Sequence, residues 1–531
     1  MAHRRHQRRA VWAVGLSLLL AGACSTARAP GGAGAYATPS GGGAPAASLA
    51  PLYDAVLRGA QRSGHTLEPD EALGRVAEEV VRRMAADPSH RQPAAPIIQA
   101  LAWHEGVVEP VPESSLLRFS GPAPLDELVS LASEAARSAP LNRVGVARAP
   151  MGDGTEAIVT VLSRRRLAFD QPVPRQLGVG DALRLSGRIV DAARKPRLVL
   201  TLPDGSNDAK ALGPGPAFAS ELPLRAEGIY QVELVAEDQR GPSVLANFPV
   251  YVGVEPPPLP AATTRSVGAP ESEAEVEAKL FALTNEARRA AGRRPLAPLP
   301  ALTEVARRHS ADMAKNHFVA HVSPTTGTPS DRLRRAGVGA IYVLENVGVA
   351  SSAREVHEGL MGSPGHRTNI LDPNATHLGV GVVRDPSSGG GLIVTENFAA
   401  VAVPINVAAA PPRVLEAINR ARAARGLPAL PNDATLSTLA QRSAARFFQG
   451  RPTAEEVTAR LNTDFARESK GFRRARVIAT VVARPDDAVS PDDAALFDRA
   501  ASAVGVGIAQ GTRPDVGTNA LFVVLLVGHG K

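Results

Sequence analysis

The sequence predicts an α+β fold made of repeated units, with an all-β sandwich inserted between the first two. Three observations support this prediction. The stretch 283–313 recurs as 417–447, and a fainter copy occupies 52–84. Each copy has apolar residues at helical spacing and is followed by two short apolar runs typical of a terminal β-hairpin. The chain of 531 residues is long enough for three or four domains of ordinary size.

The repeats are recognised by residues that recur at constant offsets, 134 between the central and C-terminal copies and 229 between the N-terminal and central copies. Shared positions in the central copy are Asn285, Leu296, Leu302, Val305, Ala306 and Met313, which pair with Asn419, Leu430, Leu436, Leu439, Ala440 and Phe447. The N-terminal copy matches at Leu67, Leu73, Val76, Ala77 and Met84. In each copy a loop with Pro or Gly separates two predicted helices. The terminal hairpins are expected at 144–162, 378–398 and 504–526.

Residues 169–255 have a different pattern. Leu198, Leu200 and Leu202 alternate with other residues, as do Tyr230, Val232 and Leu234, and a Pro-Asp-Gly turn lies between these runs. Alternation with a period of two indicates half-buried strands. We therefore expect a small immunoglobulin-like β-sandwich, with a spacing or docking role.

The N-terminus has the layout of a signal peptide. A basic start is followed by an apolar run over 10–23 and then by Cys24. Small residues before the cysteine resemble a bacterial lipoprotein signal, in which Cys24 would be lipidated and would hold the chain on a membrane. Ser25 resembles the sorting choice for the outer membrane of Gram-negative bacteria. The alternative is an ordinary secretory signal that leaves a free thiol.

The predicted divisions follow from these patterns and from two breaks rich in Pro, Gly and Ala. They are a signal peptide (1–23), a lipidated cysteine with a flexible tether (24–48), a degenerate repeat (49–168), the β-sandwich (169–255), a Pro-rich linker (256–272), the central repeat (273–403) and a degenerate C-terminal repeat (411–531).

Composition excludes several classes of function. The formal charge is +7, and removal of the four arginines of the signal peptide leaves +3, so no nucleic-acid-binding surface is indicated. Aromatic residues are only 4%, which argues against a surface that stacks on sugars or bases. The only cysteine is Cys24, which excludes intrachain disulfides, cysteine zinc sites and a catalytic thiol within the fold.

The histidines are concentrated in the central copy. Six of the twelve lie between 309 and 377, and none lies between His377 and His529. Two copies with the same scaffold therefore differ in their titratable side chains, which indicates a site in the central copy.

The central copy resembles the CAP superfamily (cysteine-rich secretory, antigen 5, pathogenesis-related 1), in its bacterial, cysteine-poor branch. The residues that carry the resemblance are the helix start 283–288, Phe318-Val-Ala-His-Val-Ser-Pro324, Asp331-Arg-Leu333, Glu345-Asn-Val347, Ser363-Pro-Gly-His-Arg-Thr-Asn-Ile-Leu371 and Gly379-Val-Gly381. The resemblance implies one intact CAP-type α-β-α sandwich, flanked by two degenerate copies.

The resemblance also implies a cleft in which two histidines and acidic residues meet. By motif these are His321, His366 and Glu345, with Asn346 and Ser363 expected beside them. Imidazoles and a carboxylate suit Zn²⁺ or another divalent cation, and they equally suit a metal-free cluster in which Glu345 orients an imidazole. The second glutamate of many family members has no counterpart, because Ser363 falls at its place, and this weakens the case for a metal.

Other sequence patterns with possible catalytic roles do not match their motifs. His357-Glu358 does not start an HExxH motif, because Met361 stands where the second histidine is needed. Ser363 does not lie in a G-x-S-x-G elbow, because that motif would also need glycine at Met361. In the C-terminal copy, Glu455 stands at the position of His321, and no histidine matches His366.

Three hypotheses follow, in order of preference. The first is a lipid-anchored extracytoplasmic protein that binds a small or lipidic ligand in the central cleft, with or without a divalent metal. The second is a metal-dependent hydrolase or peptidase, with Glu345 and His366 as the acid–base residues. The third is a structural envelope protein whose repeats hold other partners.

Overall fold

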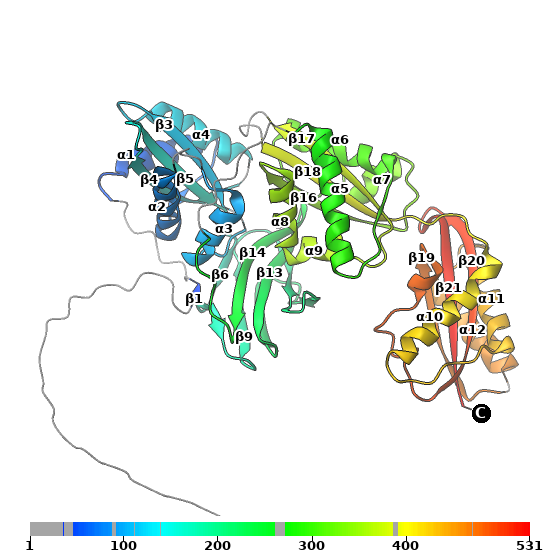
Figure 1. The fold of residues 1–531 in the computed structure, drawn as a ribbon. Helices are drawn as coiled ribbons and strands as arrows, with labels where there is room; N and C mark the ends of the chain where they lie inside the picture. The colour runs from blue at the N-terminus through cyan, green and yellow to red at the C-terminus, as the bar shows by residue number, and fades with distance from the viewer. Residues whose placement is uncertain are drawn as a thin grey trace, which may run out of the picture.

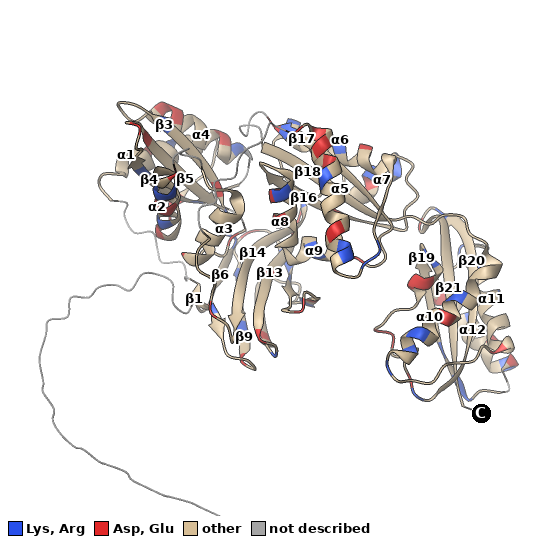
Figure 2. Cartoon of the chain, viewed as in Figure 1, with Lys and Arg blue, Asp and Glu red and all other residues tan. Residues whose placement is uncertain are grey.

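The computed structural model describes residues 35–36, 46–87, 92–110, 112–138, 140–260, 271–385, 391–469 and 471–530. The predicted signal peptide and Cys24 lie outside the described residues. Within the described part, no helix has both the length and the apolar character needed to cross a membrane. Figure 1 shows four folded units, and Figure 2 shows basic and acidic residues interspersed along all of them.

The N-terminal unit has four helices around one sheet. Its helices are α1 (Ala50–Arg62), α2 (Glu71–Ala86), α3 (Ala95–His104) and α4 (Leu125–Ser138). Its strands are β2 (Glu68–Pro69), β3 (Glu113–Phe119), β4 (Arg143–Pro150) and β5 (Glu156–Ser163), in the order β2-β4-β5-β3. Strands β4 and β5 form the predicted terminal hairpin.

The second unit is a β-sandwich of two sheets that share one apolar core. The three-stranded sheet has the order β12-β9-β6, formed by Ala217–Pro223, Ala182–Ile189 and Leu167–Phe169. The five-stranded sheet has the order β11-β10-β13-β14-β8, formed by Asn207–Ala211, Arg194–Thr201, Gly228–Asp238, Gly241–Val252 and Gln176–Leu177.

The structure corrects the predicted tether at one point. Strand β1 (Ala35–Tyr36) pairs with β7 (Val173–Pro174), and Tyr36 is buried in the core of the sandwich. Its hydroxyl donates to the Pro249 carbonyl at 2.6 Å. Tyr36 is the only aromatic residue of the segment 25–48, so it alone brings a large apolar surface that gains free energy on burial.

The central unit places its helices on both faces of a four-stranded sheet (Figure 1). The helices are α5 (Glu273–Ala290), α6 (Pro300–Asn316), α7 (Pro329–Arg335), α8 (Ala353–Met361) and α9 (Pro364–Ile370). The strands are β15 (Ala297–Pro298), β16 (Tyr342–Ala350), β17 (His377–Asp385) and β18 (Gly391–Ala400), in the order β15-β17-β18-β16. This order is the one found in the N-terminal unit.

The C-terminal unit repeats the arrangement with one change. It contains α10 (Ala410–Ala423), α11 (Ala434–Phe447), α12 (Ala454–Glu468), β19 (Arg474–Val482), β20 (Ala501–Arg513) and β21 (Gly517–His529). Its sheet has the order β19-β21-β20, and a single parallel bridge from Asn432 to Val504 replaces the short first strand.

Glycines in the penultimate strand of each repeat allow a helix to lie directly on the sheet. A Cβ atom on Gly379 would lie 2.3 Å from the backbone of Leu302, and one on Gly381 would lie 2.0 Å from the Arg307 nitrogen. Real side chains cannot approach so closely. Glycines that meet their helix in the same way are Gly145, Gly505 and Gly507. The Gly-Val-Gly pattern seen in the sequence is thus a packing requirement.

A fully buried arginine closes the loop after the first helix in both the central and the C-terminal repeat. Arg288 donates through Nε to the Arg294 carbonyl and through Nη1 to the carbonyls of Ile370 and Asp372, at 2.8, 2.6 and 2.9 Å. Arg422 makes the equivalent three bonds in the C-terminal repeat. These arginines therefore hold together segments more than 70 residues apart in sequence.

We expect Arg288→Ala to destabilise the central domain by roughly 3 kcal/mol, because three buried carbonyls would lose their donor. Scanning calorimetry of the full chain measures this as a lower Tm for one transition. The neighbouring Arg289 is exposed, so Arg289→Ala is the matched control and should shift the Tm little. Equal Tm values for the two variants would contradict the structural role.

Candidate functional site

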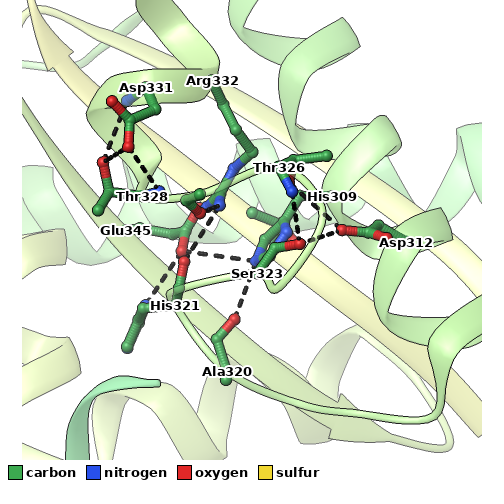
Figure 3. Close-up of polar contacts among 12 residues, drawn as sticks. His309, Asp312, Ala320, His321, Ser323, Thr326, Thr328, Asp331, Arg332 and Glu345 are labelled. Atoms are coloured by element: carbon green, nitrogen blue, oxygen red, sulfur yellow. Dashed lines mark hydrogen bonds and ion pairs between the residues drawn. The ribbon is translucent and has the colours of Figure 1, made fainter. Parts of the chain in front are cut away.

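His321 and Glu345 form the centre of the candidate site (Figure 3). His321 lies in the loop after α6, which is fixed by the buried side chains of Phe318 and Ala320. Glu345 lies within β16. The His321 Nδ1 atom is 3.1 Å from Glu345 Oε1, and only 2% of the glutamate side chain is exposed. A carboxylate accepts from an imidazole N–H, so this contact orients the ring and leaves Nε2 free.

Arg332 of α7 neutralises the buried Glu345 carboxylate. Its Nη2 lies 2.5 Å from Glu345 Oε2, and its Nη1 donates to the carbonyls of His321 and Gly327 at 3.1 and 2.7 Å. Helix α7 begins with a capping box formed by Thr328 and Asp331. The short helix therefore delivers a guanidinium that binds both the carboxylate and the histidine loop.

His309 is a third imidazole at this site, and it was not predicted from the sequence. Its Nε2 lies 2.9 Å from the Ala320 carbonyl and 3.8 Å from Glu345 Oε1. The ring is fully buried, and desolvation lowers its pKa despite the opposing effect of Glu345. His309 could have been found from the sequence by its helical spacing from the core residues Leu302 and Met313, which places it on the same buried face of α6.

His366 approaches His321 from α9. The centroids of the two rings are 6.5 Å apart. His366 is half-buried, and desolvation, with a smaller contribution from the charge of His321, lowers its pKa to about 3. His366 is therefore neutral at physiological pH. The structure thus brings together His321, Glu345 and His366, three of the five residues predicted for the site from the sequence.

The Glu345 carboxylate stays ionised although it is buried. Desolvation raises its pKa, but the hydrogen bond from His321 and the charges of Arg332 and the neighbouring histidines outweigh this effect and lower it. An ionised, doubly occupied carboxylate can orient His321 and balance charge. It is poorly suited to donating a proton as a general acid.

A second polar cluster holds the loop that follows His321. Asp312 of α6 accepts hydrogen bonds from Ser323 at 2.5 Å and from Thr325 at 2.7 and 2.8 Å. Figure 3 shows this aspartate on the far side of the loop from Glu345. The loop is therefore fixed on both sides, by Arg332 and by Asp312.

Asn346 does not line the cleft, in contrast to the prediction. Successive residues of a strand point to opposite faces of the sheet, so Asn346 faces away from Glu345. Its Nδ2 lies 3.3 Å from the His366 carbonyl and 3.2 Å from Glu396 Oε2, and its Oδ1 accepts from Asn369 at 3.0 Å. Its role is to hold α9, which carries His366.

Ser363, also predicted to lie in the cleft, makes its side-chain contact with another unit. Its hydroxyl donates to Glu233 of the β-sandwich at 2.5 Å. The residue that replaces an expected glutamate therefore contacts a glutamate from another unit. No signal in the sequence connects residues 130 positions apart in this way.

The donor set does not fit a metal ion held by His321, His366 and Glu345. Both Glu345 oxygens are engaged, and a cation would have to lie beside the Arg332 guanidinium. In the part of the chain that the structure describes, no group of three or more His, Cys, Asp or Glu side chains has the geometry of a metal site.

Comparisons with known proteins agree with this architecture. The model of the cysteine-rich secretory protein family, CAP, matches residues 281–398 and 415–526. These two domains belong to the CAP family.

One relative, the uncharacterized protein YkwD of Bacillus subtilis, is 38% identical over 126 residues, which cover 24% of this chain and 49% of YkwD. The uncharacterized membrane protein YlbC of the same organism is 40% identical over 82 residues, or 15% of this chain and 24% of YlbC. The chain thus spans at most about half the length of these relatives.

Solved structures similar to this chain include an extracellular SCP-domain protein from Bacillus anthracis. It is 26% identical with a TM-score of 0.22, over 34% of this chain and 63% of that one. A cysteine-rich secretory protein from Staphylococcus aureus is 17% identical with a TM-score of 0.21, over 45% of this chain and 78% of that one. An outer surface protein from Borrelia burgdorferi is 16% identical with a TM-score of 0.23, over 25% of this chain and 98% of that one.

The C-terminal CAP domain keeps the scaffold but has apolar residues in place of the site. By strand register, Glu345 and Asn346 correspond to Val477 and Ile478, and Glu396 corresponds to Leu525. Glu455, at the sequence position of His321, lies exposed on α12. The polar set therefore belongs to the central domain and is not a general feature of the fold.

We expect Glu396 to make a contribution to the stability of the central domain that falls as pH rises from about 5 to 8, because desolvation raises the pKa of Glu396 from 4.5 to about 7. The folded state then binds a proton more tightly than the unfolded state. Its contribution is fully present below pH 4.5 and is lost as pH rises through 7, a change of about 3 kcal/mol.

Glu396→Gln should remove this share of the pH dependence, because a neutral amide can donate to Thr284 and accept from Asn346. Urea midpoints at pH 5 and pH 8 measure the effect. Glu286 is exposed on α5, so Glu286→Gln is the control. An identical pH dependence in the two variants would show that Glu396 is not responsible.

Proposed function

We propose that this protein is an extracytoplasmic lipoprotein whose central CAP domain binds a small or lipidic ligand at His321 and His366. The observation that carries the proposal is the adjacent pair of imidazoles, with ring centroids 6.5 Å apart, beside a charge-balanced Glu345–Arg332 ion pair. A neutral His366 and a His321 with a free Nε2 offer polar anchors for a ligand, with little net charge.

Binding fits these contacts better than hydrolysis. A hydrolase at this position would need a general acid or a nucleophile, but Glu345 is ionised and engaged, and the Ser363 hydroxyl donates to Glu233. A divalent metal would require Arg332 to leave the carboxylate. The oriented His321 is the one feature that favours hydrolysis, since a carboxylate-oriented imidazole is a common general base.

The remaining units support this role in the proposal. Cys24, outside the described residues, would carry the lipid anchor, in the outer membrane if the organism is Gram-negative. The β-sandwich, which we propose to be immunoglobulin-like, would space and dock its neighbours. The two outer repeats would serve packing or protein interaction.

We expect organic extracts of the purified protein to contain a co-purifying lipid or small molecule. His321→Ala and His366→Ala should each reduce the amount of this ligand at least tenfold, because each substitution removes a polar anchor. Mass spectrometry of the extracts is the measurement, and His317→Ala, at an exposed histidine after α6, is the control. Equal ligand in all four proteins would refute the site. Peptide cleavage lost on His366→Ala would support the hydrolase instead.

We expect the full-length protein to remain with the membrane fraction and Cys24→Ser to be released from it, because several acyl chains are needed for stable anchoring. Fractionation after expression in a bacterium that processes lipoproteins measures this. Intact mass should show the added lipid on the wild type. Release of both forms to the same extent would favour an ordinary secretory signal.

A further inference from the structure

Glu233 of β13 is a fully buried carboxyl group that crosses from the β-sandwich to the central CAP domain. Its Oε2 accepts from the Ser363 hydroxyl at 2.5 Å, and its Oε1 accepts from the Gly365 N–H at 2.9 Å. Gly365 directly precedes His366. A Cβ on this glycine would lie 2.8 Å from Glu233 Oε1, so the carboxylate is seated against the backbone that carries the imidazole.

The same pair of strands also contacts the segment of the other histidine. At the turn between β13 and β14, the Arg240 carbonyl accepts from the Val322 N–H at 2.9 Å. Gly241, with φ +97°, lies so close that a Cβ there would be 3.2 Å from the His321 Cβ. One β-hairpin of the sandwich thus contacts the backbone beside both imidazoles, and Figure 1 shows it lying beside α9.

Other contacts in this interface are also polar. Asn247 Nδ2 lies 3.3 Å from the Gly362 carbonyl, and Asn207 donates to Thr368 at 3.0 Å. Arg367 donates to the Gly205 carbonyl at 3.2 Å. The sandwich therefore holds α9 along its whole length, from the residue before it to its last turn.

We propose that Glu233 is a positioning residue of the central ligand site, which is therefore built by two domains, the β-sandwich and the CAP domain. This inference rests on the proposed function, because it names what places His366 in that site. Glu233 acts through Ser363 and Gly365 and does not itself touch the ligand.

The energetics favour a positioning role for Glu233 over a role in only holding the two domains together. Desolvation raises the pKa of Glu233 to about 7 although two hydrogen bonds oppose the effect. Among the described residues Glu233 forms no ion pair, and Arg367 of α9 donates instead to the Gly205 carbonyl. Burying a carboxyl without a cationic partner is costly, and apolar residues would join two domains more strongly.

The experiment measures the reactivity of single histidines with diethyl pyrocarbonate, which acylates neutral imidazole. The full chain is used, and peptide mass spectrometry gives the rate at His366 relative to the exposed His317. We expect Glu233→Ala to raise this ratio roughly tenfold, because two buried hydrogen bonds that hold the His366 segment are lost. Glu233→Gln keeps an acceptor for Gly365 and should restore most of the protection.

Ser363→Ala removes the hydroxyl that donates to Glu233. Its effect on the His366 reactivity ratio should be non-additive with that of Glu233→Ala, which identifies the two residues as one unit. The matched control is Glu221→Gln, a glutamate on the other sheet that pairs with Arg184 at the surface. A His366 ratio in Glu233→Ala equal to the control, or strictly additive effects with Ser363→Ala, would overturn the proposal. The reactivity needs no ligand, so a failure to extract ligand would count against the proposed function alone.

Discussion

The buried Glu345 carboxylate is the constraint on which the central domain depends. A charge within a sheet, almost sealed from water, is tolerated only with cationic and hydrogen-bonding partners. Arg332 supplies the charge, His321 supplies an N–H, and His309 lies close behind them. Because Arg332 also binds the carbonyls of His321 and Gly327, neutralising the glutamate fixes the histidine loop as well.

The sequence contained enough information for the repeats and for the three main site residues. Helical spacing, Pro and Gly loops and Gly-Val-Gly runs are local patterns, and the structure has helices and terminal hairpins where they were expected. The family membership of the central and C-terminal domains is confirmed. Contacts that depend on tertiary structure could not be predicted from such local patterns. Arg332 and Glu233 reach their partners Glu345 and Ser363 only because separate elements pack together in the folded chain. Asn346 was misplaced because side chains alternate along a strand, so that it lies on the opposite face of the sheet from Glu345.

Comparison of the repeats separates scaffold from site. The central and C-terminal domains share a buried arginine and a paired asparagine with nearly identical hydrogen bonds, those of Arg288 and Asn285 and of Arg422 and Asn419. Both also need glycines where a helix touches the sheet. Where the central domain has glutamate and asparagine, the C-terminal domain has valine, isoleucine and leucine. The C-terminal domain therefore has the same architecture without the polar cluster, which is specific to the central domain of the two.

The pairing of β1 with β7 changes how the first half of the chain is organised. Ala35 lies opposite Pro174 and Tyr36 opposite Val173, so the sandwich begins before the N-terminal repeat and resumes after it. The two strands that pair here come from before and after that repeat in sequence, as in domains inserted into a host fold. The sandwich is thus the parent domain and the first repeat its guest, so a deletion that excises the guest must end before β6 (Leu167–Phe169), the first sandwich strand after the repeat, to leave the host's strands in sequence.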